Sequence, residues 1–156
     1  MAYSNKLTSN TATTEFMLIG STQKLSTLSS QPELSIDNVP IVKYTSVKSL
    51  GIYIDENLRW QTHFDKLSKK IASGIGAIKS NRGVVPSPAL HCVYNALIQS
   101  QFDYCNIAWD NCGKTLFDRL QKLQNRAARV LTFRRYAADV NRLFRQVNLF
   151  IHLLFI

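Results

Sequence analysis

The chain is poor in cysteine, and the cysteines it has suit neither a metal site nor a disulfide framework. Cys92, Cys105 and Cys112 are odd in number, form no Cys-x-x-Cys pair and have no histidine at a ligand interval. A structural zinc site needs four such ligands at short, regular spacings. The pattern therefore predicts reduced thiols, which are typical of an intracellular protein.

Long hydrophobic runs are also scarce. Residues 1–16, "MAYSNKLTSNTATTEF", are polar and lack the apolar stretch of a secretion signal. The end of the chain, "QVNLFIHLLFI", is apolar, but only 11 residues follow Arg145, and a membrane-spanning helix needs about 20. We therefore expect a protein of the nucleus or cytoplasm that is not secreted and has no membrane partner, with residues 145–156 as a divergent apolar tail.

Acidic residues are few in the second part of the chain. Residues 1–60 carry five bases and five acids, whereas residues 61–156 carry 14 bases and 5 acids, so the whole net charge of +9 falls there. Such an asymmetry indicates a polyanionic partner. A basic surface that is only solvated remains the alternative.

Short strands are expected in the first part. The apolar run at residues 14–20 is typical of a buried strand, and the Ser/Thr-rich segment at residues 21–33 is typical of a loop. In "LSIDNVPIV", Asp37 and Asn38 tolerate the positive φ of a tight turn, which predicts a hairpin. Pro40 limits the strand after this turn to an edge or a bulge.

The hydrophobic period changes at residue 55. Before it, Leu50, Ile52 and Ile54 alternate on one face of a half-buried strand. After it, apolar residues recur every three or four positions, which predicts an amphipathic helix. They are Trp60, Phe64, Leu67, Ile71, Ile75 and Ile78. Gly74 and Gly76 weaken that helix by about 1 kcal/mol each relative to alanine, so packing must hold its end.

Two further helices are predicted. One has Ser87 as N-cap, runs to about residue 101 and turns apolar side chains inward. These are Leu90, Tyr94, Leu97 and Ile98. The other begins near its candidate N-cap Thr115, with Asp118 at the capping-box position. Its apolar stripe is Leu116, Leu120, Leu123, Ala127, Val130 and Leu131. Strands followed by helices define an α+β chain.

The acidic pair in "YIDE" is the obvious candidate for a metal site. Two-metal phosphoryl transfer needs carboxylates from separate elements that hold two ions about 4 Å apart. No suitable partner for Asp55 and Glu56 is evident, because Asp37 and Glu33 belong in a turn and a loop, and Glu15 opens a strand. An acid between a strand and a helix commonly caps the backbone, for about 0.5–2 kcal/mol. We therefore interpret the pair as structural and predict no catalytic residue and no metal ligand in this chain.

A basic stripe on the third predicted helix is the stronger functional signal. Its cations recur at intervals of 3, 4 and 3, beside the apolar stripe. They are Arg119, Lys122, Arg126 and Arg129. Lysines of the first predicted helix extend this surface if the helices pack side by side. They are Lys66, Lys69 and Lys70. A phosphate backbone would relieve the repulsion between these cations and release counterions, although a solvated face is about equally compatible with the stripe alone.

Three segments in this order carry a resemblance to a known family. They are "SNKLTSNTATTEFMLIGS", "VKSLGIYIDENLRWQTHFDKLSKKI" and "ALIQSQFDYCNIAWDNCGKTLFDRLQKLQNRAARVL". From about Ser4 to Phe144 the chain resembles the carboxyl-terminal part of the reverse transcriptases of non-LTR (LINE-type, jockey-like) retrotransposons. These are right-hand polymerases that copy RNA into DNA with Mg²⁺ held by aspartates of the palm.

The resemblance implies that the catalytic aspartates would precede residue 1, so this chain is expected to hold no Mg²⁺ and to be inactive alone. Where the family pattern Asn-x-x-Lys-Thr-Glu has its lysine, this chain has Thr13. The resemblance further implies palm-edge strands and a primer-grip hairpin at residues 1–57 and a helical thumb and connection region at residues 58–144. The expected primer-grip residues are Leu50, Gly51, Ile52, Tyr53, Ile54 and Asp55. The seven cations above are the expected contacts to the nucleic-acid backbone.

The sequence therefore predicts an α+β fragment of a right-hand polymerase, with short antiparallel strands followed by a thumb-like bundle of three or more helices. Its expected partners are an RNA/DNA template–primer duplex and the remaining palm and fingers. Two alternatives stay open: a non-enzymatic basic helical module that binds protein, and a non-functional remnant.

Overall fold

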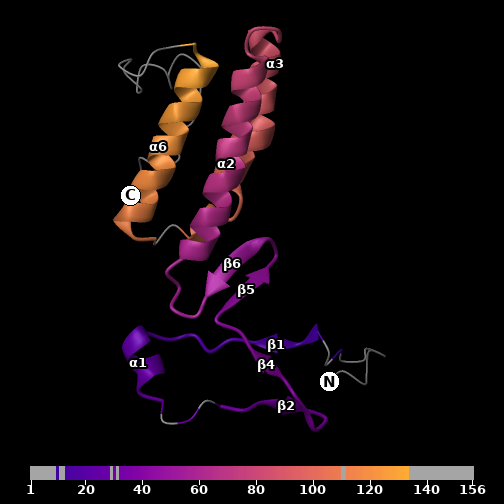
Figure 1. Cartoon of the computed structure of the whole chain (residues 1–156), viewed down its shortest axis with the longest axis vertical. Coiled ribbons are helices and arrows are strands. Elements are labelled where there is room, and N and C mark those ends of the chain that lie inside the picture. Colours follow the sequence, from indigo (N-terminus) through magenta and orange to yellow (C-terminus); the bar gives the residue numbers. More distant parts are fainter. Residues whose placement is uncertain (1–9, 11–12, 29, 31, 110–111, 134–156) are drawn as a thin grey trace. The chain divides into compact units, whose positions relative to one another are not determined.

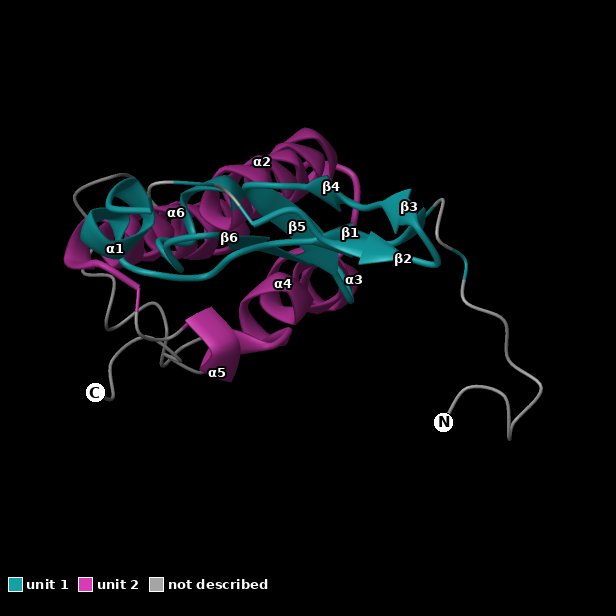
Figure 2. Cartoon of the chain, turned by 90° about the horizontal axis from the view of Figure 1, so that it is seen from below, with its two compact units in different colours: residues 1–62 teal, residues 63–156 magenta. Residues whose placement is uncertain are grey.

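The computed structural model of the 156-residue chain describes residues 10, 13–28, 30, 32–109 and 112–133. The chain divides into two units, residues 1–62 and residues 63–156 (Figure 2). Short strands dominate the first unit and helices the second (Figure 1). The α+β class is confirmed at this level. The predicted apolar tail at residues 145–156 lies outside the described residues.

The strands of the first unit pair in twos. β1 (Glu15–Phe16) pairs in parallel with β4 (Val42–Lys43), whereas β2 (Ser35–Ile36) pairs antiparallel with β3 (Val39–Pro40). The turn of this hairpin has φ angles of 51° and 62° at its two central residues, Asp37 and Asn38. The predicted hairpin is therefore confirmed, but the expectation of antiparallel pairing throughout is wrong for β1 and β4.

Two expectations for residues 14–33 are also wrong. The predicted buried strand has only the two residues of β1 in strand conformation, and neither is buried. The predicted loop contains a short helix, α1 (Thr22–Ser26), whose N-cap Ser21 accepts a hydrogen bond at its hydroxyl from the Lys24 backbone N–H at 3.3 Å. A serine N-cap supplies the acceptor that the first helical turn lacks, and that local bond outweighed the loop-like composition.

The hairpin at the end of the first unit joins β5 (Ser46–Ser49) to β6 (Ile52–Asp55) in antiparallel register. The two-residue turn places Leu50 and Gly51 at φ angles of 47° and 85°. Positive φ at both positions is typical of the hairpin turn whose twist matches the flanking strands. Leu50 is therefore 86% exposed in the turn, and the prediction that it shares a strand face with Ile52 and Ile54 is wrong.

The long helix of the second unit is α2 (Gln61–Asn81). All six apolar residues of the predicted stripe, from Trp60 to Ile78, are buried, which confirms that prediction. Gly74 is also buried, and a Cβ built on it would lie 2.9 Å from Cγ1 of Ile98. The glycine therefore lets α2 approach the next helical segment closely, which explains its place in a helix that it weakens intrinsically.

The second predicted helix is interrupted by a π-helical turn. It comprises α3 (Ser87–Tyr94), the π turn η3 (Asn95–Gln99) and α4 (Ser100–Asp103), and its N-cap is Pro86 rather than Ser87. The buried side chains recur at every fourth residue. They are Leu90, Tyr94, Ile98 and Phe102. The wider π turn keeps this spacing of four on one face, so Leu97, predicted to point inward, is exposed.

A short helix, α5 (Asn106–Trp109), leads to α6 (Lys114–Leu131). The N-cap of α6 is Gly113, which makes no side-chain capping hydrogen bond, so the capping box predicted from Thr115 is wrong. The buried face of α6 is rotated from the predicted stripe. It consists of Leu120, Gln124, Ala127, Ala128 and Leu131. The small alanines and the long glutamine fill space beside neighbouring helices, which hydropathy alone does not reveal.

Candidate nucleic-acid interface

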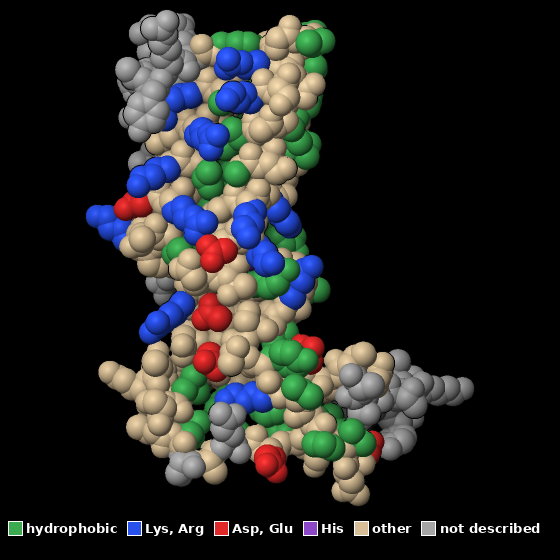
Figure 3. All heavy atoms as spheres, in the orientation of Figure 1, with side chains coloured by type: hydrophobic (Ala, Val, Ile, Leu, Met, Phe, Trp, Pro, Cys, Tyr) green, Lys and Arg blue, Asp and Glu red, His purple; other side chains and the backbone are tan. Residues whose placement is uncertain are grey.

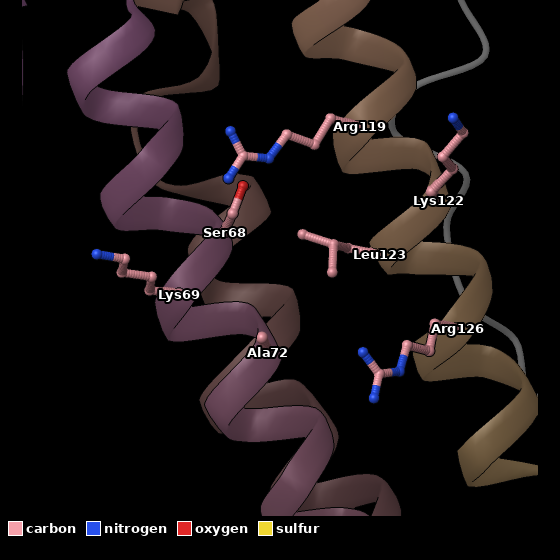
Figure 4. A pocket seen from close by; sticks show the side chains of 7 residues that line it. All are labelled: Ser68, Lys69, Ala72, Arg119, Lys122, Leu123 and Arg126. Atoms are coloured by element: carbon pink, nitrogen blue, oxygen red, sulfur yellow. The ribbon is translucent and has the colours of Figure 1, made fainter.

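An open groove lies between α2 and α6 in the second unit (Figure 4). It encloses about 450 Å³. Seven residues line it: Ser68, Lys69, Ala72, Arg119, Lys122, Leu123 and Arg126. Four of the seven are cations and none is acidic, so the groove lining is strongly basic.

The four cations do not point the same way. In Figure 4, Arg119 and Arg126 extend from α6 toward α2, with Leu123 between them, whereas the ammonium groups of Lys69 and Lys122 point outward from the groove. Arg119 and Arg126 are seven residues apart, which on a helix is about 10 Å along the axis. The arginines therefore bracket a space, and the lysines supply charge at its rim.

One of the arginines is held by an acid. A guanidinium nitrogen of Arg119, Nη1, donates to Oδ1 of Asp65 on α2 at 2.5 Å, in an ion pair whose side chains are 43% and 46% exposed. A pair this exposed contributes only about 0–1 kcal/mol to stability. Its main effect is to hold the guanidinium on the α2 side of the groove.

The predicted backbone-contacting residues are only partly brought together. Arg119, Lys122 and Arg126 of the predicted stripe line the groove with Lys69 of α2. Arg129 is half-buried and does not line it, and Lys66 and Lys70 are exposed on α2 outside the lining. Figure 3 shows Lys and Arg side chains gathered over this helical face.

Sequence reasoning missed the neutral part of the groove and the acid that holds Arg119. Ser68 is buried with the apolar stripe of α2, and its signal in the sequence is its place four residues after Phe64 and three before Ile71. Asp65 was detectable as the single acid of α2. Which arginine it would meet depends on how the two helices pack.

The predicted primer-grip residues form the tip and second strand of the β5–β6 hairpin. Leu50 and Gly51 make the turn, and the other four, from Ile52 to Asp55, are β6. The hairpin therefore exists as expected. Its role in gripping a primer stays a prediction.

The Asp55 carboxylate is occupied by the backbone that follows it. Oδ1 accepts hydrogen bonds from the N–H groups of Asn57 and Arg59 at 3.2 and 2.8 Å, and Oδ2 accepts one from Trp60 at 2.6 Å. The predicted capping role is confirmed. Among the residues that the structure describes, no three His, Cys, Asp or Glu side chains are grouped to hold a metal ion.

Two buried titratable groups lie in the helical unit away from the groove. Burial lowers the pKa of His63 from its usual 6.5, and the Lys70 ammonium lowers it further. Burial raises the pKa of Tyr94, with a smaller contribution from Asp103. The Tyr94 hydroxyl donates to Gln99 Oε1 at 3.1 Å, and Gln99 Nε2 donates to Asp103 Oδ1 at 2.9 Å. These contacts tie α3 and α4 together across the π turn and are structural.

Comparisons with known proteins leave the family open. No family model matches the chain, and neither the curated proteins nor the solved structures yielded a match. No helix within the described ranges is long and apolar enough to cross a membrane. The three cysteines form no disulfide.

Proposed function

We propose that the helical unit binds the sugar–phosphate backbone of a nucleic-acid duplex without sequence preference. The observation that carries the proposal is the groove between α2 and α6, which four cations line. Phosphate contacts position a duplex without reading its bases, and cations on helices are typical of such contacts. Together with the resemblance of the ordered segments, this favours a fragment of a non-LTR reverse transcriptase, with a primer-grip hairpin, a template–primer-binding thumb and no catalytic aspartates.

Salt dependence tests the binding. The affinity of the chain for a short RNA–DNA duplex, measured by fluorescence anisotropy, should fall steeply as salt rises, because each neutralised phosphate releases counterions. The double variant Lys122→Gln, Arg126→Gln should flatten the slope by about 0.7–0.9 for each phosphate that the variant no longer neutralises.

A matched control is Lys24→Gln on α1, in the unit without net charge, which should leave the slope unchanged. If the double variant had the wild-type slope of affinity against salt concentration, these cations would only be solvated and would not contact phosphates. Binding that depends on duplex sequence would also contradict the proposal.

A separate measurement addresses catalysis. We expect no primer extension from the purified chain with Mg²⁺ and nucleoside triphosphates. The acid to test is Asp55, whose carboxylate accepts hydrogen bonds from three backbone N–H groups. Extension that survives an Asp55→Asn substitution would reveal a catalytic centre elsewhere in the chain, and extension abolished by it would make Asp55 a ligand.

A further inference from the structure

One residue that lines the groove, Ser68, has a buried hydroxyl. Ser68 is only 6% exposed, and its hydroxyl oxygen has no hydrogen-bond partner among the described residues. A serine in a helix usually satisfies its hydroxyl on the carbonyl four residues earlier or in solvent, and this one does neither. Because buried polar groups are almost always paired, an unpaired hydroxyl beside a groove is a candidate donor to a group that enters the groove.

The surroundings of Ser68 specify the charge of that ligand. Arg119 and Arg126 reach into the same groove from α6, and Lys69 and Lys122 add positive charge at its rim (Figure 4). The Ser68 hydroxyl points toward the Arg119 guanidinium (Figure 4), and a hydroxyl donor beside a guanidinium suits an acceptor-only anion. Phosphate oxygens fit this description, and arginine binds them through parallel N–H bonds.

The remaining lining specifies what is attached to the anion. Ala72 and Leu123 form an apolar surface between the cations, which a free inorganic anion leaves uncovered. The volume of about 450 Å³ lies in the range of small-ligand pockets and exceeds the size of one phosphate group. A phosphodiester with its sugar would occupy both parts of the groove.

We infer that the α2–α6 groove is a discrete site for one backbone phosphodiester, in which the Ser68 hydroxyl donates to a phosphate oxygen and Arg119 and Arg126 bind the charge. The inference rests on the proposed function for the source of the phosphate. It goes beyond that function because it assigns the phosphate a fixed position and a neutral hydrogen-bond donor, the Ser68 hydroxyl. A diffuse basic surface would provide neither.

Asp65 regulates this site by competing for Arg119. In the structure, the Arg119 guanidinium donates to the Asp65 carboxylate. A phosphate must share or displace that contact, and the exposed ion pair is weak enough to be displaced. Removing the acid while keeping its shape should therefore strengthen phosphate binding.

The test combines three variants of the full chain with two probes, a short RNA–DNA duplex and inorganic phosphate. Ser68→Ala should weaken duplex binding about tenfold, because it removes a hydrogen bond to a charged group, and it should leave the salt slope unchanged because it removes no charge. Ser73→Ala is the matched control, since Ser73 is an exposed serine of α2 outside the groove lining, and it should stay within about twofold of wild type. Asp65→Asn should tighten binding about threefold.

Stability gives an independent readout. Without ligand, Ser68→Ala should be at least as stable as wild type, because it removes an unsatisfied buried hydroxyl. A merely structural serine would lose stability and affinity together. Opposite signs of the two effects are therefore the signature of a ligand-binding hydroxyl.

The outcomes separate the site from the proposed function. If Ser68→Ala binds the duplex like wild type and the salt dependence persists, the discrete site is wrong and general backbone binding stands. If wild type binds inorganic phosphate, with Ser68 and Ala72 amide resonances shifting, but binds no duplex, the anion site stands and the duplex function fails. Binding of neither probe overturns both, and an Asp65→Asn variant no tighter than wild type overturns the competition.

Discussion

Among the described residues, the strand unit contains two of the buried apolar side chains, Ile52 and Trp60, and the helical unit contains the other fourteen. The strand unit is instead connected by hydrogen bonds between segments far apart in sequence. Asn57 Nδ2 donates to the Gly20 carbonyl, and the Gly20 N–H donates to the Glu56 carbonyl, both at 3.0 Å. Arg59 also reaches Thr22 Oγ1, at 2.9 Å. One chain thus uses two modes of stabilisation.

The charges follow the same division. The formal charges of the strand unit sum to zero, and the helical unit carries the whole net charge of +9. A unit with a large apolar core tolerates repulsion between like charges on its surface, because burial supplies most of its stability. This difference in apolar burial explains why the basic groove lies in the helical unit: its larger apolar core offsets the repulsion between the groove cations.

The largest expected effect comes from removing equal side chains from the two units. Ile71→Ala, at a 0% exposed position of α2, should lower the free energy of unfolding by about 2–5 kcal/mol, because it reduces apolar burial and leaves a cavity. Ile54→Ala, at a half-buried position of β6, should cost about 1 kcal/mol or less, because less apolar surface is buried there. Urea unfolding followed by circular dichroism measures both. Equal losses of stability in the two variants would contradict the difference in apolar burial between the units.

Two glycines of α2 test how closely its helical neighbours pack. Gly74→Ala should destabilise by about 1–3 kcal/mol, because its Cβ would overpack against Ile98. Gly76→Ala is the matched control. Apart from its chain neighbours and the local helix backbone, no described heavy atom lies within 4 Å of its added Cβ, so Gly76→Ala should stabilise the helix by about 0.5–1 kcal/mol. Thermal unfolding of the two variants measures both, and changes of the same sign would contradict the close approach.

A third comparison concerns the hydrogen bonds of the strand unit. Asp55→Ala should cost about 1–2 kcal/mol locally, because three backbone N–H groups would be left without their acceptor. The effect should appear as faster amide hydrogen exchange at Arg59 and Trp60. Glu56→Ala, the neighbouring acid, should leave exchange at these amides unchanged. If both variants accelerated amide exchange at Arg59 and Trp60 to a similar extent, the loss of a negative charge, rather than of the hydrogen bonds, would be the cause.

The smallest expected effect is a pH dependence in the helical unit. Because the folded-state pKa of His63 is lowered from 6.5, the unfolded chain binds the proton first, and stability should fall as the pH drops below about 6.5. Unfolding midpoints at pH values of about 7.5 and about 5.5 should differ more in wild type than in His63→Gln. Lys70→Gln should reduce the difference in part. A midpoint that rises on acidification would reverse the assigned sign.

Local signals in the sequence predicted local structure well. The stripe from Trp60 to Ile78 and the turn at Asp37 and Asn38 were both found, because each depends on residues close together in the chain. The errors lie where packing competes with local preference. Leu97 is exposed because it lies in the π turn, where the spacing of buried residues differs from that of an α-helix. Gln124 is buried on α6, although the predicted buried stripe of that helix contained only apolar residues.

By itself, the sequence determined the α+β order, the uneven charge and the cations of α6, since composition and periodicity are properties of single segments. The tertiary structure alone decided which cations share a groove, since that depends on how α2 packs against a helix distant in sequence. It joined Arg119 to Asp65 and gave the buried Ser68 hydroxyl, which lines the groove, no partner among the described residues. It also brought two helical segments into close approach at Gly74. A binding site between helices is a relation between segments, and only packing defines it.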